Sequence, residues 1–269
     1  MKNKKMLIIS LVLFLLVGGS IFAVIKIRQN RSGEEPAEER QRTRITEPVN
    51  IIDVAERPYM LIEPVADGHH VVIRVESLNK PADELEFELE YQSGTLVQGA
   101  LGSIEIDQLP ASKKIMLGSC SAGGACSFHE DIKGGSLLMR FTSEEKYILK
   151  TDWRYLENVA RETAISSRDV KFQLEAKVLA NHRYLVVTNS PGAPEDLEAQ
   201  LKSEIYTLAS TSALTGEGTL TIRAGEESEK LAIYGYDGTE WTKFESTVDG
   251  KVVTATVELM QTYVVGEEN

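Results

Sequence analysis

The stretch "ELEFELEYQ", residues 84–92, decides the fold class, because apolar and acidic residues alternate along it. In an extended chain, successive side chains point to opposite faces. One face therefore carries four glutamates, and the other carries the apolar residues Leu85, Phe87, Leu89 and Tyr91. This period of two predicts a β-strand that is buried on one face only.

Short runs of the same kind lie on both sides of this strand. They include "YMLIEP" at 59–64, "HHVVIRVES" at 69–77, "SLLMRFTS" at 136–143 and "KYILKTDWRYL" at 146–156. About seven or eight such runs, separated by Gly, Pro, Asn and Asp, are typical of an antiparallel sandwich. We therefore expect an all-β fold, with a first Ig-like β-sandwich domain over residues 58–156.

A second β-sandwich domain is expected over residues 170–269, because the strand rhythm weakens at 157–169 and then resumes. Asp-Gly pairs at 237–238 and 249–250 separate strand-like runs, which is a strong hairpin signal. Pro194 and the acidic residues that follow it predict a short helix near 194–203. The alternative to two domains is one larger, continuous sandwich.

The N-terminus reads as a membrane anchor. Residues 1–5 form a basic tail, and residues 6–25, "MLIISLVLFLLVGGSIFAVI", contain no charge. A helix of that length spans about 30 Å, the thickness of the hydrocarbon core of a bilayer. We expect a retained transmembrane helix or signal anchor. The alternative is a signal peptide that is cleaved after Ser20 or Ala23.

Residues 26–57 are rich in charge and predict a solvated stalk. Lysines and arginines lie on both sides of the apolar segment, and a count of them alone would place the stalk in the cytoplasm. Long domains that follow a helix often cross the membrane regardless of charge, and the cysteine pair and the β domains favour export. We therefore expect a single-pass protein of the cell membrane, with its N-terminus in the cytoplasm and its β domains outside.

The charge balance argues against nucleic acid as a partner. Asp and Glu number 41 against 29 Lys and Arg, which gives a formal net charge of −12. Binding to a phosphate backbone depends on an excess of basic residues. The expected partners are the membrane and a protein or glycan at the surface.

The stretch "GSCSAGGACS", residues 118–127, holds both cysteines of the chain. Cys120, Cys126 and His129 could supply three zinc ligands, but structural zinc sites use four and closer spacing. A catalytic thiol would need a base and a position that lowers its pKa, and a Gly-rich turn between strands offers no evident helix terminus. In an exported domain, a close cysteine pair is most simply a disulfide, so we expect a Cys120–Cys126 bond that stiffens one exposed loop.

The other candidates have structural explanations. His69 and His70 begin a predicted strand, and Trp153 and Trp241 lie on predicted strands, where core packing is the simpler role. We expect no catalytic residues, no cofactor and no metal site. A pocket of polar residues near His129, Glu130 and Asp131 would instead favour an enzyme.

The segment "IYGYDGTEWTKFESTVDGKVVTATVELMQTYVV", residues 233–265, resembles the closing part of Ig-like and ZU5-like β-sandwich domains of bacterial surface proteins. The whole chain is similar to single-pass bacterial membrane proteins with extracytoplasmic β domains. In some ZU5 relatives a His-Phe-Ser sequence in the last strand supports self-cleavage. Leu259, Met260 and Gln261 stand at the corresponding positions here, so the resemblance implies a surface β-sandwich without self-cleavage.

Together these features predict a membrane-anchored, extracytoplasmic protein with a structural, adhesive or accessory role in a surface complex. The alternative is a module that binds or senses a small ligand or a glycan. That alternative predicts a concave, aromatic-lined patch on one sandwich face, with Trp153 or Trp241 exposed to solvent.

Overall fold

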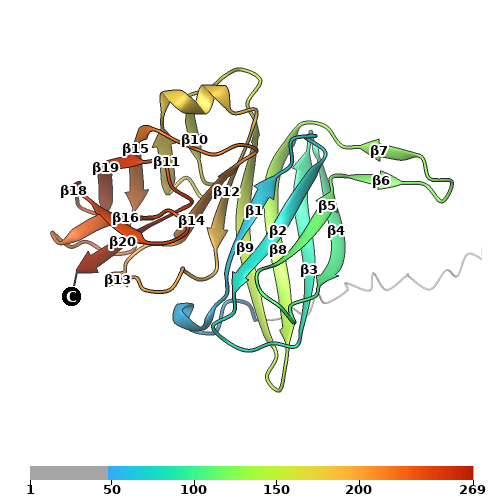
Figure 1. Cartoon of the computed structure of the whole chain (residues 1–269), viewed down its shortest axis with the longest axis horizontal. Helices are drawn as coiled ribbons and strands as arrows, with labels where there is room; N and C mark the ends of the chain where they lie inside the picture. The colour runs from blue at the N-terminus through green and yellow to red at the C-terminus, as the bar shows by residue number, and fades with distance from the viewer. Residues whose placement is uncertain (1–47, 269) are drawn as a thin grey trace, which may run out of the picture. The chain divides into compact units, whose positions relative to one another are not determined.

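An antiparallel sheet of ten strands runs through residues 48–268, which is the part of the chain that the computed structural model describes (Figure 1). The predicted basic tail, the helix at 6–25 and most of the stalk at 26–57 lie outside this range. Within residues 48–268, no helix combines the length and the hydrophobicity that crossing a bilayer requires.

The described chain is built of β-strands and two short 3-10 helices. The first half contains η1 (Val54–Glu56), β1 (Tyr59–Pro64), β2 (His70–Ser77), β3 (Glu84–Ser93), β4 (Leu96–Ile104), β5 (Ala111–Met116), β6 (Gly118–Cys120), β7 (Cys126–Phe128), β8 (Ile132–Thr142) and β9 (Tyr147–Glu157). The second half contains β10 (Ala164–Ser166), β11 (Phe172–Glu175), η2 (Lys177–Asn181), β12 (Tyr184–Ser190), β13 (Ala199–Leu201), β14 (Ile205–Ser210), β15 (Glu217–Arg223), β16 (Leu231–Tyr236), β17 (Trp241–Phe244), β18 (Ser246–Asp249), β19 (Val252–Glu258) and β20 (Thr262–Glu268).

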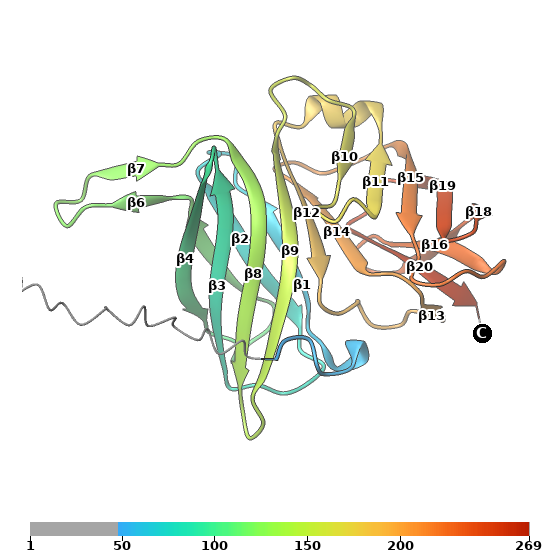
Figure 2. The ribbon, with the colours of Figure 1, turned by 180° about the vertical axis from the view of Figure 1, so that it is seen from behind.

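The central sheet passes from one half of the chain to the other. Its order is β17-β16-β20-β14-β12-β9-β8-β3-β4, and β13 pairs with β20 beside this order. The two halves meet where β9 pairs with β12, over five residue pairs from Tyr184 opposite Glu157 to Thr188 opposite Trp153. Smaller sheets, β1-β2-β5 and β10-β11-β15-β19-β18, pack against this sheet, and β6 pairs with β7 alone (Figure 2).

The two covering sheets lie on opposite faces of the central sheet, as β12 shows. Val186 packs in the core beneath β1-β2-β5, whereas its neighbour Val187 packs in the core beneath the five-stranded sheet. Successive side chains of a strand point to opposite faces. The run "YLVV" of β12 is therefore apolar at consecutive positions because both of its faces are covered.

The all-β, antiparallel fold class is confirmed. Two large cores form, one mainly from each half, with a smaller cluster in the second half, but the sheet is continuous across the predicted boundary at 157–169. The assignment of residues 58–156 and 170–269 to two separate domains stays a prediction.

The strand predicted at 84–92 is confirmed as β3, with its apolar residues buried. Charged residues often protect the free edge of a sheet, but the glutamates of β3 do not, because β3 lies between β8 and β4. Both Asp-Gly sequences form the predicted hairpins, β16–β17 and β18–β19, and β20 is the last strand.

The helix predicted near 194–203 is wrong. This segment runs in extended conformation and contains β13, which pairs with β20. Leu197, Ala199 and Leu201 lie two residues apart and pack together on one face of the sheet. Asp196 has a φ of 64°, outside the helical range. The period of two therefore prevails over the helix-start signal of Pro194.

Candidate functional site

Cys120 and Cys126 are disulfide-bonded, as predicted, and stand directly opposite each other across β6 and β7. The hairpin that they close projects from the rest of the molecule, and its strand residues are exposed or half-buried (Figure 1). At its base, the ring of Phe128 stacks on the ring of His69 with 4.1 Å between centroids. Since the two sulfur atoms are bonded to each other, neither serves as a thiolate for zinc or for catalysis.

The histidines contact other side chains. Nδ1 of His129 lies 3.0 Å from the hydroxyl of Tyr91, and Nδ1 of His70 lies 2.8 Å from Oδ2 of Asp67. Within residues 48–268, no three His, Cys, Asp or Glu side chains are grouped as metal ligands. The described chain therefore does not bring His129 together with a set of further ligands.

A groove of about 840 Å³ does lie beside His129, Glu130 and Asp131, where a pocket would favour an enzyme. Some of its charged side chains form ion pairs, either within the groove or with a neighbour outside it. Asp131 pairs with Lys133 at 2.8 Å, and Arg168 of the same groove pairs with Asp152 at 2.9 Å. The described residues of the groove offer charged groups but no nucleophile that is paired with a base. That the protein has no catalytic residues stays a prediction.

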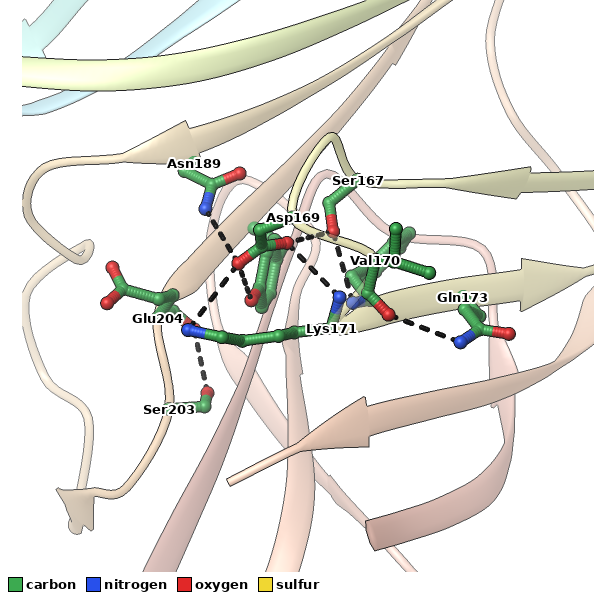
Figure 3. A network of polar contacts seen from close by, with 10 residues as sticks. Ser167, Asp169, Val170, Lys171, Gln173, Asn189, Ser203 and Glu204 are labelled. Carbon is green, nitrogen blue, oxygen red and sulfur yellow. Dashed lines mark hydrogen bonds and ion pairs between the residues drawn. The ribbon is translucent and has the colours of Figure 1, made fainter. Parts of the chain in front are cut away.

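The turn between β10 and β11 contains a dense polar network (Figure 3). The carboxylate of Asp169 accepts hydrogen bonds from Ser167, from the Tyr206 hydroxyl at 3.1 Å and from the amide of Asn189 at 3.5 Å. Lys171 adds an ion pair at 3.7 Å. Burial, and then the nearby Asp169 carboxylate, raises the pKa of Tyr206, so its phenol stays protonated and donates. This network anchors the five-stranded sheet to the central sheet and is a structural element.

The two tryptophans differ in their surroundings. Trp153 is 0% exposed, and its indole N–H donates to the carbonyl of Glu90 at 3.2 Å. The prediction of a core role is therefore confirmed for Trp153. Trp241 is half-buried at the edge strand β17, where it lines a groove.

This aromatic groove has a volume of about 570 Å³ and is lined by the rings of Tyr234, Tyr236 and Trp241. Tyr236 and Trp241 are cross-strand neighbours in the β16–β17 hairpin, with 5.3 Å between ring centroids. Across the groove, the indole N–H of Trp241 donates to the carbonyl of Glu195 at 2.9 Å. That bond ties the extended segment before β13 to β17.

Acidic side chains surround the aromatic rings. The carboxylates are those of Glu195, Asp196, Glu198, Glu240 and Glu268, and the one lysine is Lys243. Nζ of Lys243 lies 2.7 Å from Oε2 of Glu268, and this contact lowers the pKa of the Glu268 carboxyl. Glu268 is therefore ionised at neutral pH and neutralises the lysine, which leaves the groove anionic.

The sequence itself carries a signal for part of this groove. The Asp-Gly turn at 237–238 predicts a hairpin, and a hairpin brings Tyr236 next to Trp241. Alternation along "IYGY" then places Tyr234 on the same face as Tyr236. The contribution of Glu195 was not predictable, because it depends on the path of a segment that was predicted to be helical.

A second feature is the free edge of the central sheet. The strand β4 pairs with β3 on one side, and no strand of residues 48–268 pairs with its other side. Leu101 and Val97 are 78% and 74% exposed on this edge. Residues 94–104, "GTLVQGALGSI", carry no charge. An uncharged, apolar edge presents unpaired backbone groups to any strand that approaches.

Comparison with models of protein families, with characterised proteins and with solved structures finds no match to this chain.

Proposed function

We propose that this protein has a structural role at the cell surface, where membrane-anchored copies associate side by side through β4. In this proposal residues 6–25 span the membrane, the N-terminus lies in the cytoplasm and the β-sheets lie outside. The observation that carries the proposal is the free edge of β4. Natural sheets usually protect such an edge with charges, prolines or a covering loop, and residues 94–104 contain neither a charge nor a proline.

A second copy of the chain is the partner that best fits β4. Two copies of one strand can pair antiparallel about a two-fold axis, so that each residue meets its symmetry mate. A chain with a net charge of −12 repels itself over most of its surface. The uncharged stretch at 94–104 adds no charge of its own to that repulsion.

The stalk is a poorer partner for the same edge. Residues 28–44 contain one apolar side chain, Ala37, apart from a proline at 36. Such a segment could pair its backbone with β4 but would leave Val97 and Leu101 uncovered. A shared membrane would also raise the effective concentration of a second copy.

The test is the self-association of the full chain in detergent, measured by sedimentation at several protein concentrations. Val97→Lys/Leu101→Lys places two ammonium groups at the edge of each copy. Because each substitution occurs on both sides of a two-fold interface, we expect association to weaken by about 30-fold or more, which corresponds to about 2 kcal/mol.

The matched control is Val159→Lys, which replaces a valine that is 63% exposed and lies outside β4. It is expected to associate as the unaltered chain does. A chain that is monomeric at every concentration would refute the proposal, and so would equal association of all variants.

The second candidate function is a module that binds a small ligand or a glycan. The aromatic groove favours it, since ligand sites are usually concave, with aromatic walls and a few polar groups. Its supporting feature is that Trp241, on the edge strand β17, is half-buried and lines the groove, whereas Trp153 is buried in the core.

A further inference from the structure

We infer that the aromatic groove binds a small organic cation, an alkylammonium group held between aromatic rings and carboxylates. This inference rests on the second candidate function and names its ligand class. It does not depend on β4 or on self-association.

The first observation is the unpaired hydroxyl of Tyr234. The side chain is 7% exposed and lines the groove, yet its hydroxyl makes no hydrogen bond within residues 48–268. The ring lies against Gly266, where an added Cβ would stand 3.1 Å from the Tyr234 ring. Gly266 therefore makes room for the ring. Because this hydroxyl reaches the surface of the groove, a ligand there can accept a hydrogen bond from it.

The second observation is the aromatic wall. The centroids of the Trp241 and Tyr236 rings are 5.3 Å apart and the rings are inclined at 46° to each other, so together they form one angled aromatic wall. The bond from Trp241 to the Glu195 carbonyl fixes the indole in place. Tryptophan and tyrosine faces attract ammonium and guanidinium groups through the ring quadrupole.

The third observation is the charge of the groove. Lys243 is paired with Glu268, and no ion pair within residues 48–268 neutralises the other four carboxylates, those of Glu195, Asp196, Glu198 and Glu240. A carboxylate accepts hydrogen bonds and donates none. An anionic or acceptor-rich ligand would therefore be repelled, whereas a cation gains from both the rings and the carboxylates.

The same observations argue for an organic cation rather than a sugar or a metal ion. Sugar hydroxyls need donors as well as acceptors, and the groove has few side-chain donors beyond Lys243 and the hydroxyls. The carboxylates are not grouped as metal ligands within the described chain. An alkylammonium group matches both the apolar rings and the negative charge.

The experiment is a titration of the full chain in a polyoxyethylene detergent, which has neither a sugar nor an ammonium headgroup. The probe is choline, and its neutral isostere 3,3-dimethyl-1-butanol has the same shape without the charge. Cellobiose tests the glycan alternative. Binding is measured by ligand-observed NMR, together with tryptophan fluorescence, in which Trp241 responds and the buried Trp153 does not.

We expect choline to bind, and we expect the affinity of the neutral isostere to be lower by about tenfold or more. Trp241→Leu should weaken choline binding about fivefold or more, which is the loss expected for one ring contact. Glu195→Gln/Glu240→Gln should also weaken choline binding. The loss relative to the unaltered chain should be larger at low salt than at high salt. The matched control Glu229→Gln changes an exposed glutamate outside the groove and is expected to leave choline binding unchanged.

Equal binding of choline and its isostere would overturn the inference, because the groove would then recognise shape alone. Binding of cellobiose without choline would overturn it in favour of the glycan alternative. Absence of binding by all three probes would overturn both, and self-association through β4 would remain a separate result.

Discussion

The disulfide between Cys120 and Cys126 offers a prediction whose size can be worked out from the structure. The perturbation is the double variant Cys120→Ser/Cys126→Ser. The bond closes a loop with a sequence separation of 6. On the chain-entropy description, closing a loop that short lowers the free energy of folding by about 2 kcal/mol. That figure is the upper bound for the loss if the hairpin remains folded without the bond.

The hairpin is not expected to remain folded without it. None of the β6 and β7 residues is buried, and an isolated two-stranded hairpin is marginally stable in water. Its contacts with the body are at its base, where Phe128 stacks on His69. Without the bond the native state gains local freedom too, so the loss in global stability should be below about 1 kcal/mol.

Two measurements together check this reasoning. Urea unfolding gives the free energy of unfolding, and hydrogen exchange detected by mass spectrometry gives local opening at residues 118–128. We expect a small loss of stability with much faster exchange in the hairpin. The control Ser119→Ala/Ser127→Ala changes the neighbouring cross-strand pair and keeps the bond. A loss of about 2 kcal/mol or more with unchanged exchange would refute the account of the hairpin as a peripheral element.

Two further predictions concern the body of the protein. Gly135→Ala should destabilise the fold by about 3 kcal/mol, because a Cβ there would stand 2.1 Å from the carbonyl oxygen of Glu90; urea unfolding measures it, and a loss of less than about 1 kcal/mol would contradict it. His182 is buried beside Ser210, and burial lowers its pKa from 6.5, so stability should fall as the pH falls below 6.5, where only the unfolded chain takes up the proton. His182→Gln should reduce this slope in thermal unfolding scans, and an unchanged slope would contradict the prediction.

Local patterns in the sequence predicted the local structure well. The alternation at 84–92 predicted β3 and its buried face, because the period of a strand is set by the backbone itself. The Asp-Gly sequences predicted two hairpins, because a turn is determined by the few residues that form it. The spacing of the cysteines predicted their pairing for a similar reason.

Contacts between distant segments were not predictable in the same way. The continuity of the sheet depends on the pairing of β9 with β12, and between them the chain leaves the sheet to form β10 and β11. The free edge at β4 was not predictable, because the charge pattern of β3 does not show which strand lies beyond it. The segment at 194–203 adopts an extended path because β20 offers it a partner strand. The helix propensity of the segment alone contains no information about that partner.

The measurement that tests the central claim most directly is cysteine cross-linking of the full chain in membranes. Single cysteines at Val97, Gly99, Leu101 and Ser103 occupy alternate positions of β4, all on one face of the sheet. If two copies pair antiparallel through β4, mild oxidation should give covalent dimers with a maximum at one position, where the two-fold axis passes. Val159→Cys, an exposed site outside β4, sets the background. Dimer yields at all four positions no higher than this background would contradict association through β4.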